Sequence, residues 1–155
     1  PPNCGDFDRP LSDKGVDHAY RIATYFEEDG QDWLPDFILC SAAKRTRQTI
    51  APLLENAACK VHFSEDLYMA GTGSIYEAIK QIDDAYKCAL VTGHNPSMHA
   101  LVNFLMKTAD GDCADKVAYN YPTGTLGFLQ CDVKSWADIM PHENHLRQVL
   151  TKHDI

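Results

Sequence analysis

Leu90-Val91-Thr92-Gly93-His94-Asn95-Pro96 is the stretch that decides the fold. A β-branched apolar run ends at a glycine, a histidine follows, and Pro96 suits the first turn of a helix. We therefore predict that His94 stands at the tip of a strand and faces a helix N-terminus, where backbone N–H groups and the helix dipole favour an anion. A histidine in this position can bind phosphate and change its protonation near neutral pH.

A second stretch, residues 41–49, has the same layout. It follows the apolar strand predicted at residues 37–40 and places Lys44, Arg45 and Arg47 at the start of a helix. Cations are unfavourable there unless an anion lies nearby, and arginine offers a planar fork of donors that matches phosphate oxygens. The spacing does not say which of the three faces the anion. Together the two stretches predict a phosphate site at the carboxyl edge of an α/β sheet.

The rest of the chain continues this alternation. Ser12 is suited to cap a helix that ends near Glu28, and Ser74 to cap another, while residues 43–55 and 97–106 read as two more helices. Strands are expected at residues 60–64, 87–92 and 125–131, residues 108–116 are expected to be a polar loop, and residues 140–155 a helix or a partly disordered tail. This order predicts βαβ units and a largely parallel sheet, within a single domain spanning residues 1–155.

The composition limits the partners of the chain. Its 155 residues are 45% hydrophobic and carry a net charge of −8, which argues against binding to nucleic acid or to an acidic membrane. No apolar run approaches the ~20 residues of a transmembrane helix. The six cysteines contain no Cys-x-x-Cys pair, so we expect reduced thiols and a cytoplasmic protein.

Several other candidate residues have two interpretations. Arg9 is as well suited to a loop salt bridge with Asp6 or Asp8 as to a phosphate contact. Residues 71–74 look like a phosphate loop but lack the glycine and lysine pattern of one, so a helix-capping loop is favoured. His142 and His145 have no further ligands to complete a metal site, which favours surface histidines. His99 is expected on the helix surface or behind the site.

An ordered set of motifs resembles the histidine phosphatase superfamily and, within it, the small SixA-like phosphohistidine phosphatases. The matching pieces are residues 6–12 with Gly15, 35–41, 45–49, 65–68, 91–96 and 121–124. The resemblance covers about positions 6 to 130 and implies a three-layer α/β/α fold of the phosphoglycerate-mutase type. It also implies that Arg45 clamps phosphate and that His94 is the second active-site histidine, with Arg9 and Asn95 as substrate-binding residues and no metal or other cofactor.

The sequence departs from the family in one respect. The Arg-His-Gly or Arg-His-Ala motif, which ends the family's central first strand and supplies the nucleophilic histidine, does not occur in these residues. We expect the natural protein to carry it upstream of Pro1; the alternative is a noncatalytic module that binds phosphate or a phosphoprotein.

With the upstream histidine, the resemblance implies a phosphatase that forms a phosphohistidine intermediate. The candidates for the leaving-group acid are Glu65, Asp66 and Glu77, none of them compelling. A weak acid suits a good leaving group such as imidazole, which favours phosphohistidine in proteins over a small phosphorylated molecule.

Overall fold

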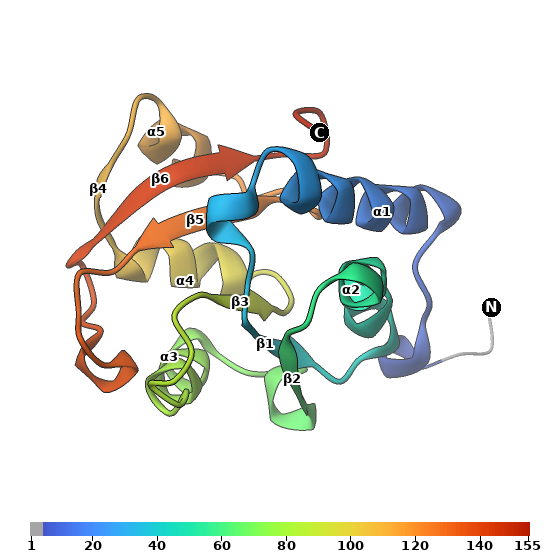
Figure 1. Ribbon diagram of the computed structural model, residues 1–155, viewed down its shortest axis with the longest axis horizontal. Helices are drawn as coiled ribbons and strands as arrows, with labels where there is room; N and C mark the ends of the chain where they lie inside the picture. The colour runs from blue at the N-terminus through green and yellow to red at the C-terminus, as the bar shows by residue number, and fades with distance from the viewer. Residues whose placement is uncertain (1–4) are drawn as a thin grey trace. The chain divides into compact units, whose positions relative to one another are not determined.

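The computed structural model describes residues 5–155, in which helices and strands alternate as predicted (Figure 1). The helices are α1 (Asp13–Glu28), α2 (Lys44–Asn56), α3 (Thr72–Lys80), α4 (Ser97–Leu105) and α5 (Cys113–Ala118). The strands are β1 (Phe37–Ser41), β2 (Lys60–Ser64), β3 (Ala89–Thr92), β4 (Met106–Ala109), β5 (Leu126–Gln130) and β6 (Asn144–Leu150). Short 3-10 turns are η1 (Asp6–Asp8), η2 (Gln31–Trp33), η3 (Glu65–Leu67) and η4 (Trp136–Asp138). The chain divides into two compact units: residues 5–69, 85–93 and 155 form the first, and residues 70–84 and 94–154 the second.

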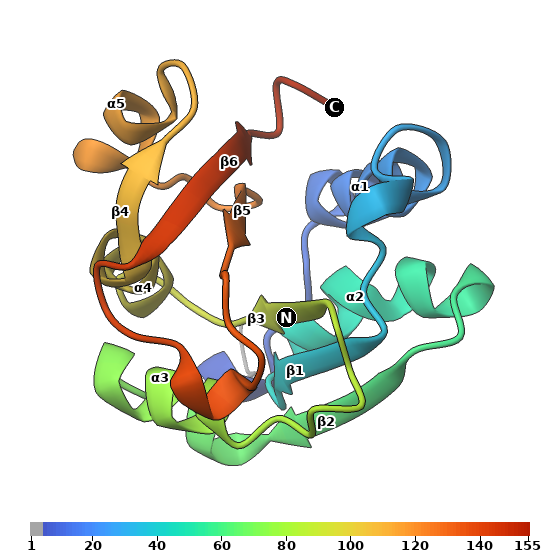
Figure 2. The same cartoon turned by 60° about the vertical axis from the view of Figure 1, so that its left-hand side comes forward.

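The first unit is built on a parallel sheet with the strand order β2-β1-β3 (Figure 2). Phe37 of β1 lies beside Lys60 of β2 and Ala89 of β3, and the pairing runs forward in register from there. All three strands therefore end at the same edge of the sheet. Among residues 5–155, β3 pairs with β1 alone, and no strand is paired with its other edge.

Helix α1 begins where Ser12 predicted it. The Ser12 hydroxyl accepts a hydrogen bond from the N–H of Gly15 at 3.1 Å, which satisfies one of the free donors of the first turn. Ala19, Ala23 and Phe26, which are spaced as on one helical face, are buried, as are His18 and Ile22. Val16 and Tyr20, which continue the apolar spacing, are exposed and lie at the margin of the buried face.

Asp36 ties the starts of the three strands together. Its carboxylate accepts hydrogen bonds from the backbone N–H groups of Lys87, at 2.9 and 3.2 Å, and Cys88, at 3.0 Å. Its own N–H donates to the carbonyl of Cys88, and its carbonyl accepts from the N–H of Lys60. One residue thus links the loops that precede β1, β2 and β3.

The second unit is built on a sheet with the order β4-β6-β5, in which β6 (red in Figure 2) is the central strand. It pairs in parallel with β4 and antiparallel with β5. Its core cluster contains buried residues from α4, α5 and β6: Val102, Cys113, Val117, Leu146 and Val149.

Two predictions for this unit are wrong. The C-terminal residues are neither helical nor disordered, because β6 buries Leu146 and Val149, and the buried amide of Asn144 donates to the carbonyls of Leu105 and Met140, both at 2.9 Å. The segment expected as a polar loop contains β4 and α5. Both are short, and their pattern of buried residues emerges only when they pack on β6.

The start of α3 also differs from the prediction. The N-cap is Gly71, in an extended conformation, and its carbonyl accepts from the N–H of Ile75 at 3.2 Å. Ser74 therefore lies inside the first turn. Residues 71–74 thus begin a helix, as predicted. The helix starts through the extended backbone of Gly71 and not through a serine side chain.

The α/β class and the mostly parallel pairing are confirmed, since three of the four strand pairs are parallel. No helix between Gly5 and Ile155 combines the length and apolarity that crossing a bilayer requires. Of the cysteines, Cys40, Cys59, Cys88, Cys113 and Cys131 are free thiols, as expected.

Replacing Asp36 by alanine should lower the free energy of unfolding by about 1–3 kcal/mol, because the N–H groups of Lys87 and Cys88 lose their acceptor. Urea denaturation followed by circular dichroism measures the change. Asp32→Ala is the matched control, since Asp32 is an exposed residue of η2. Equal stability of the two variants would contradict the role given to Asp36.

Leu146→Ala should cost about 2–5 kcal/mol, because it opens a cavity beneath a side chain that is fully buried in the centre of the sheet. Leu34→Ala removes the same atoms from a leucine that is 42% exposed, and should cost much less. Thermal unfolding of both variants tests whether β6 belongs to the core.

Candidate functional site

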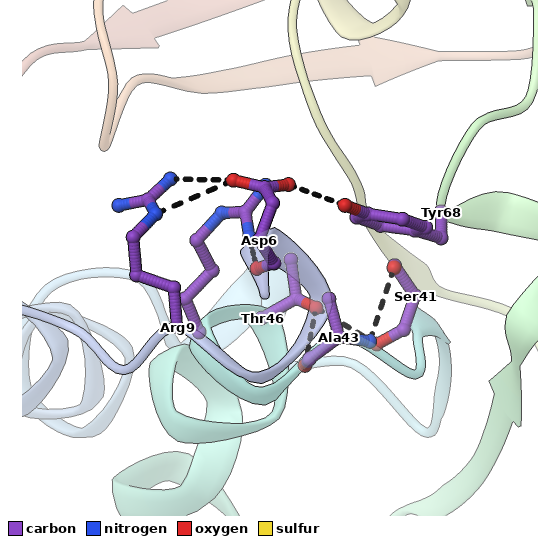
Figure 3. Close-up of polar contacts among 7 residues, drawn as sticks. Asp6, Arg9, Ser41, Ala43, Thr46 and Tyr68 are labelled. Carbon is purple, nitrogen blue, oxygen red and sulfur yellow. Dashed lines mark hydrogen bonds and ion pairs between the residues drawn. The ribbon is translucent and has the colours of Figure 1, made fainter. Parts of the chain in front are cut away.

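The candidate site begins where β1 ends and α2 starts. Ser41 is the last residue of β1, and α2 begins three residues later at Lys44. The hydroxyl of Thr46 donates to the carbonyls of Ser41, at 2.8 Å, and Ala43, at 2.9 Å (Figure 3). The side chains of Ser41 and Thr46 are both buried. These bonds fix the turn and therefore the direction in which the first helical turn leaves the sheet.

The N-terminus of α2 is not capped by a side chain. Its N-cap is Ala43, and the first turn contains no acidic residue but carries Lys44 and Arg45. The N–H groups of a first turn have no acceptor within the helix, and the helix dipole gives this end a partial positive charge. The arrangement favours an anion, as the sequence predicted.

Among residues 5–155, Arg45 is the cation of this turn that binds a carboxylate. Its guanidinium donates from Nη1 to the backbone oxygen of Asp6 at 2.8 Å and from Nη2 to Oδ2 of Asp6 at 3.2 Å. Its side chain is only 19% exposed. Arg47 instead donates from Nε to the carbonyl of Ala42, and Lys44 is exposed. Of the three cations, Arg45 is the one that binds the carboxylate of Asp6. Which of them faces an anion stays a prediction.

Asp6 is the centre of a cluster that also contains Arg9, Arg45 and Tyr68 (Figure 3). Arg9 donates from Nε and Nη2 to Oδ1 of Asp6, both at 3.3 Å, and the hydroxyl of Tyr68 donates to Oδ2. The hydrogen bond from Tyr68, followed by the two guanidinium groups, lowers the pKa of Asp6 although partial desolvation opposes them. Asp6 is therefore ionised throughout the neutral range.

Arg9 forms the loop salt bridge that was one of its two interpretations. Arg9 and Arg45, two residues predicted for the site, are thus brought together on one carboxylate.

Asp6 and Tyr68 were not predicted as site residues. A signal for Tyr68 exists in the sequence, because it follows β2 by four residues, and the end of β2 lies at the same sheet edge as the end of β1. For Asp6 the spacing of three from Arg9 indicated a salt bridge, but nothing indicated that Arg45 shares it.

His94 follows β3 by two residues, and its backbone carbonyl accepts from the N–H of Met98 in α4 at 3.0 Å. Thr92, the last residue of β3, lies beside Cys40, the penultimate residue of β1. The segments that carry Arg45 and His94 therefore leave adjacent strands at the same edge of the sheet. That the two side chains converge on one phosphate stays a prediction.

The side-chain amide of Asn95 both donates and accepts a hydrogen bond. Its Nδ2 donates to the carbonyl of Tyr121 at 2.7 Å, and its Oδ1 accepts from the N–H of His99 at 3.3 Å. The peptide bond between Asn95 and Pro96 is cis. Asn95 thereby joins the residue after His94 to the loop before β5; its predicted contact with substrate is untested.

His99 lies behind this segment. Its Nε2 is 2.6 Å from the carbonyl of Val117, and its ring stacks on that of Tyr121 with centroids 5.8 Å apart. Burial raises the pKa of Tyr121 to about 12, so its hydroxyl stays protonated. These contacts hold α4, α5 and the loop before β5 together.

The three candidate acids lie on the surface. Glu65 and Asp66 are exposed in η3, and Glu77 pairs with Lys80 at 3.0 Å. The two tail histidines also have ordinary partners: His145 bonds Thr108 and Asp110, and His142 lies 3.4 Å from the carbonyl of Met106. No group of three or more metal-ligating side chains occurs in the part of the chain that the structure describes.

Comparison with known proteins gives relatives of similar length. The family model of the histidine phosphatase superfamily (branch 1) matches residues 3–69. A protein of Mycobacterium tuberculosis is 32% identical over 145 residues, covering 91% of this chain and 87% of that protein. A protein of Mycobacterium leprae is 26% identical over 132 residues, covering 83% and 78%.

Solved structures share the fold. One from Nakamurella multipartitia, assigned as a phosphohistidine phosphatase SixA, has a TM-score of 0.81 and 26% identity over 94% of this chain and 86% of its own. Another from Agrobacterium tumefaciens, with the same assignment, has a TM-score of 0.79 and 23% identity over 97% and 88%. The sequence relatives, the family model and the shared fold together show that the chain is a phosphatase belonging to the histidine phosphatase superfamily.

Proposed function

We propose that this protein is a metal-independent phosphatase that removes phosphate from phosphohistidine in proteins through its own phosphohistidine intermediate. The observation that carries the proposal is the placement of Arg45. Its guanidinium stands at an uncapped helix N-terminus, at the carboxyl edge of a parallel sheet, and already binds a carboxylate. Such a position suits the nonbridging oxygens of a phosphoryl group.

The nucleophile in this proposal is a histidine of an Arg-His-Gly or Arg-His-Ala segment upstream of Pro1. The residues present contain no Arg-His pair. The unpaired edge of β3 supports the proposal, because a further parallel strand paired there would end beside β1 and β3. Such a strand would complete the single domain expected from the sequence.

The reaction has two steps. The nucleophilic nitrogen attacks phosphorus in line, a P–N bond to the enzyme forms, and the bond to the leaving group breaks with its electron pair. Water then attacks phosphorus, and the P–N bond breaks. Inorganic phosphate is released, and the nucleophilic histidine of the enzyme is regenerated. Arg45 and the upstream arginine bind the oxygens on which charge develops, and His94 adds positive charge beside them. Positive side chains thus supply the charge stabilisation that a metal ion provides elsewhere.

The preference for phosphohistidine comes from the leaving group. Glu65, Asp66 and Glu77 are exposed, so they are weakly placed to protonate a poor leaving group within a dry site. A protonated imidazole leaves without a strong acid, whereas a sugar alkoxide does not. SixA-assigned structures among the relatives support this choice.

A second candidate is a small phosphate monoester as substrate. A structure from Escherichia coli assigned as an α-ribazole-5'-P phosphatase shares the fold with a TM-score of 0.66 and 14% identity over 94% of this chain and 86% of its own. We also propose a cytoplasmic location, supported by the free thiols between Gly5 and Ile155.

Arg45→Ala and His94→Ala, each in the full-length gene product, should lower kcat by roughly 10²–10³, the usual cost of removing one donor to a developing oxyanion. Steady-state turnover of a phosphohistidine peptide measures the loss. Lys44→Ala is the control, because it removes a neighbouring positive charge from an exposed side chain and should leave turnover close to wild type. Near-normal turnover in both test variants would refute the site.

The substrate class is tested by comparing kcat/KM on three substrates: a phosphohistidine peptide, p-nitrophenyl phosphate and a sugar phosphate. We expect the phosphohistidine peptide and p-nitrophenyl phosphate, which have good leaving groups, to be turned over and the sugar phosphate to be poor. A sugar phosphate that matches the peptide would favour the small-molecule alternative.

A further inference from the structure

Three side chains donate hydrogen bonds to one carboxylate in the first unit, and this arrangement points beyond Arg45. We infer that Asp6 is an internal placeholder for the phosphoryl group, and that Arg9 and Tyr68 bind the phosphoryl oxygens together with Arg45 once Asp6 has left. This inference rests on the proposed function, because it assumes that Arg45 binds phosphate.

The first step is the match between donors and acceptor. Arg9 contributes two N–H groups, Arg45 one and Tyr68 its hydroxyl to the two oxygens of Asp6. A tetrahedral phosphoryl group presents the same kind of acceptor, with one more oxygen and more negative charge. Charge-assisted hydrogen bonds from guanidinium groups are stronger to such an anion than to a neutral acceptor.

The second step is the balance of charge. Two guanidinium groups face a single carboxylate, so the cluster of Asp6, Arg9 and Arg45 keeps a net charge of +1. A phosphoryl dianion would overcompensate this charge if Asp6 stayed, and the two anions would repel each other at close range. Substrate binding therefore requires that the Asp6 carboxylate move away from the guanidinium groups.

The third step is that the Asp6 side chain can turn away from its donors. It lies in η1, a turn of three residues, and its side chain is 53% exposed. The segment is held at its far end, where the N–H of Leu11 donates to the side-chain oxygen of Gln48 in α2 at 2.8 Å. The backbone of Asp6 is held as well, because its oxygen accepts from Arg45 at 2.8 Å and the ring of Phe7 lies against that of Tyr68. The exposed carboxylate can therefore leave its donors by rotation of the side chain, with no shift of the backbone.

Tyr68 and Arg45, in contrast, are mounted on fixed elements. Arg45 is part of α2, and its guanidinium carbon lies 6.0 Å from the centre of the Tyr68 ring. The N–H of Tyr68 donates to the carbonyl of Glu65 in η3, which directly follows β2. The hydrogen bond to Asp6 raises the pKa of Tyr68. A tyrosine hydroxyl is protonated at neutral pH without this bond as well, so it can donate to an incoming oxygen once Asp6 has left.

The test measures binding of inorganic phosphate to the full-length protein by isothermal titration calorimetry. If Asp6 occupies the donors about nine-tenths of the time, phosphate can bind only to the remaining tenth of the molecules, which weakens its binding about tenfold. Asp6→Asn should therefore tighten phosphate binding about tenfold. Asp8→Asn is the matched control: Asp8 lies in the same turn, and its side chain makes no ion pair within residues 5–155. Binding by Asp6→Asn that is no tighter than by Asp8→Asn would overturn the inference.

The role of Tyr68 is tested by combining the variants. If Tyr68 binds phosphate, Tyr68→Phe should weaken phosphate binding in the wild type and also in the Asp6→Asn background. If it acts only by holding Asp6, the substitution has no effect once residue 6 is asparagine, and the role of Tyr68 as a phosphate donor is refuted.

Arg45→Ala separates this inference from the proposed function. Loss of phosphate binding and turnover in Arg45→Ala, with Asp6→Asn equal to its control, would refute the placeholder alone. Unchanged phosphate binding in Arg45→Ala would refute the site on which both depend.

Discussion

Parallel pairing of β1 with β2 and β3 is the constraint on which the first unit depends. Because the strands run the same way and in register, whatever follows each of them emerges at one edge. Asp36 secures the opposite edge by binding the backbone before β3 and joining the start of β2. The chemistry is thus concentrated where the strands end, and the edge where they begin is used for stability.

This geometry explains which parts of the fold the sequence could predict. Ser12, the apolar run of β1 and the cations of α2 carry local signals, and the elements they predict are present with nearly the expected bounds. Strand β6 carries a weak signal, since polar residues interrupt its apolar positions and only pairing with β4 and β5 on both sides buries them. Helix α5 is too short to show the helical spacing of apolar residues in the sequence. The start of α3 was placed wrongly because it depends on the backbone conformation of Gly71 and not on a capping side chain.

The candidate site, too, could be predicted from the sequence only in part. The cationic residues at a predicted helix start, directly after a predicted strand, indicated a phosphate-binding arginine. Arg45 does lie in the first turn of a helix, α2. What distinguishes Arg45 from Lys44 and Arg47 is its contact with Asp6, which is 39 residues away in sequence and is brought near by the packing of η1 on α2. Such a contact leaves no trace in local spacing. The role of Tyr68 depends in turn on the parallel register, which places the end of β2 beside the end of β1.

The unpaired edge of β3 has a consequence for the sheet. Ala89, Leu90, Val91 and Thr92 carry no charge and include no proline, so nothing in the strand itself discourages a neighbouring molecule from adding its own backbone there. A backbone added there would extend the sheet, and a strand already paired with β3 would prevent a second one from doing so.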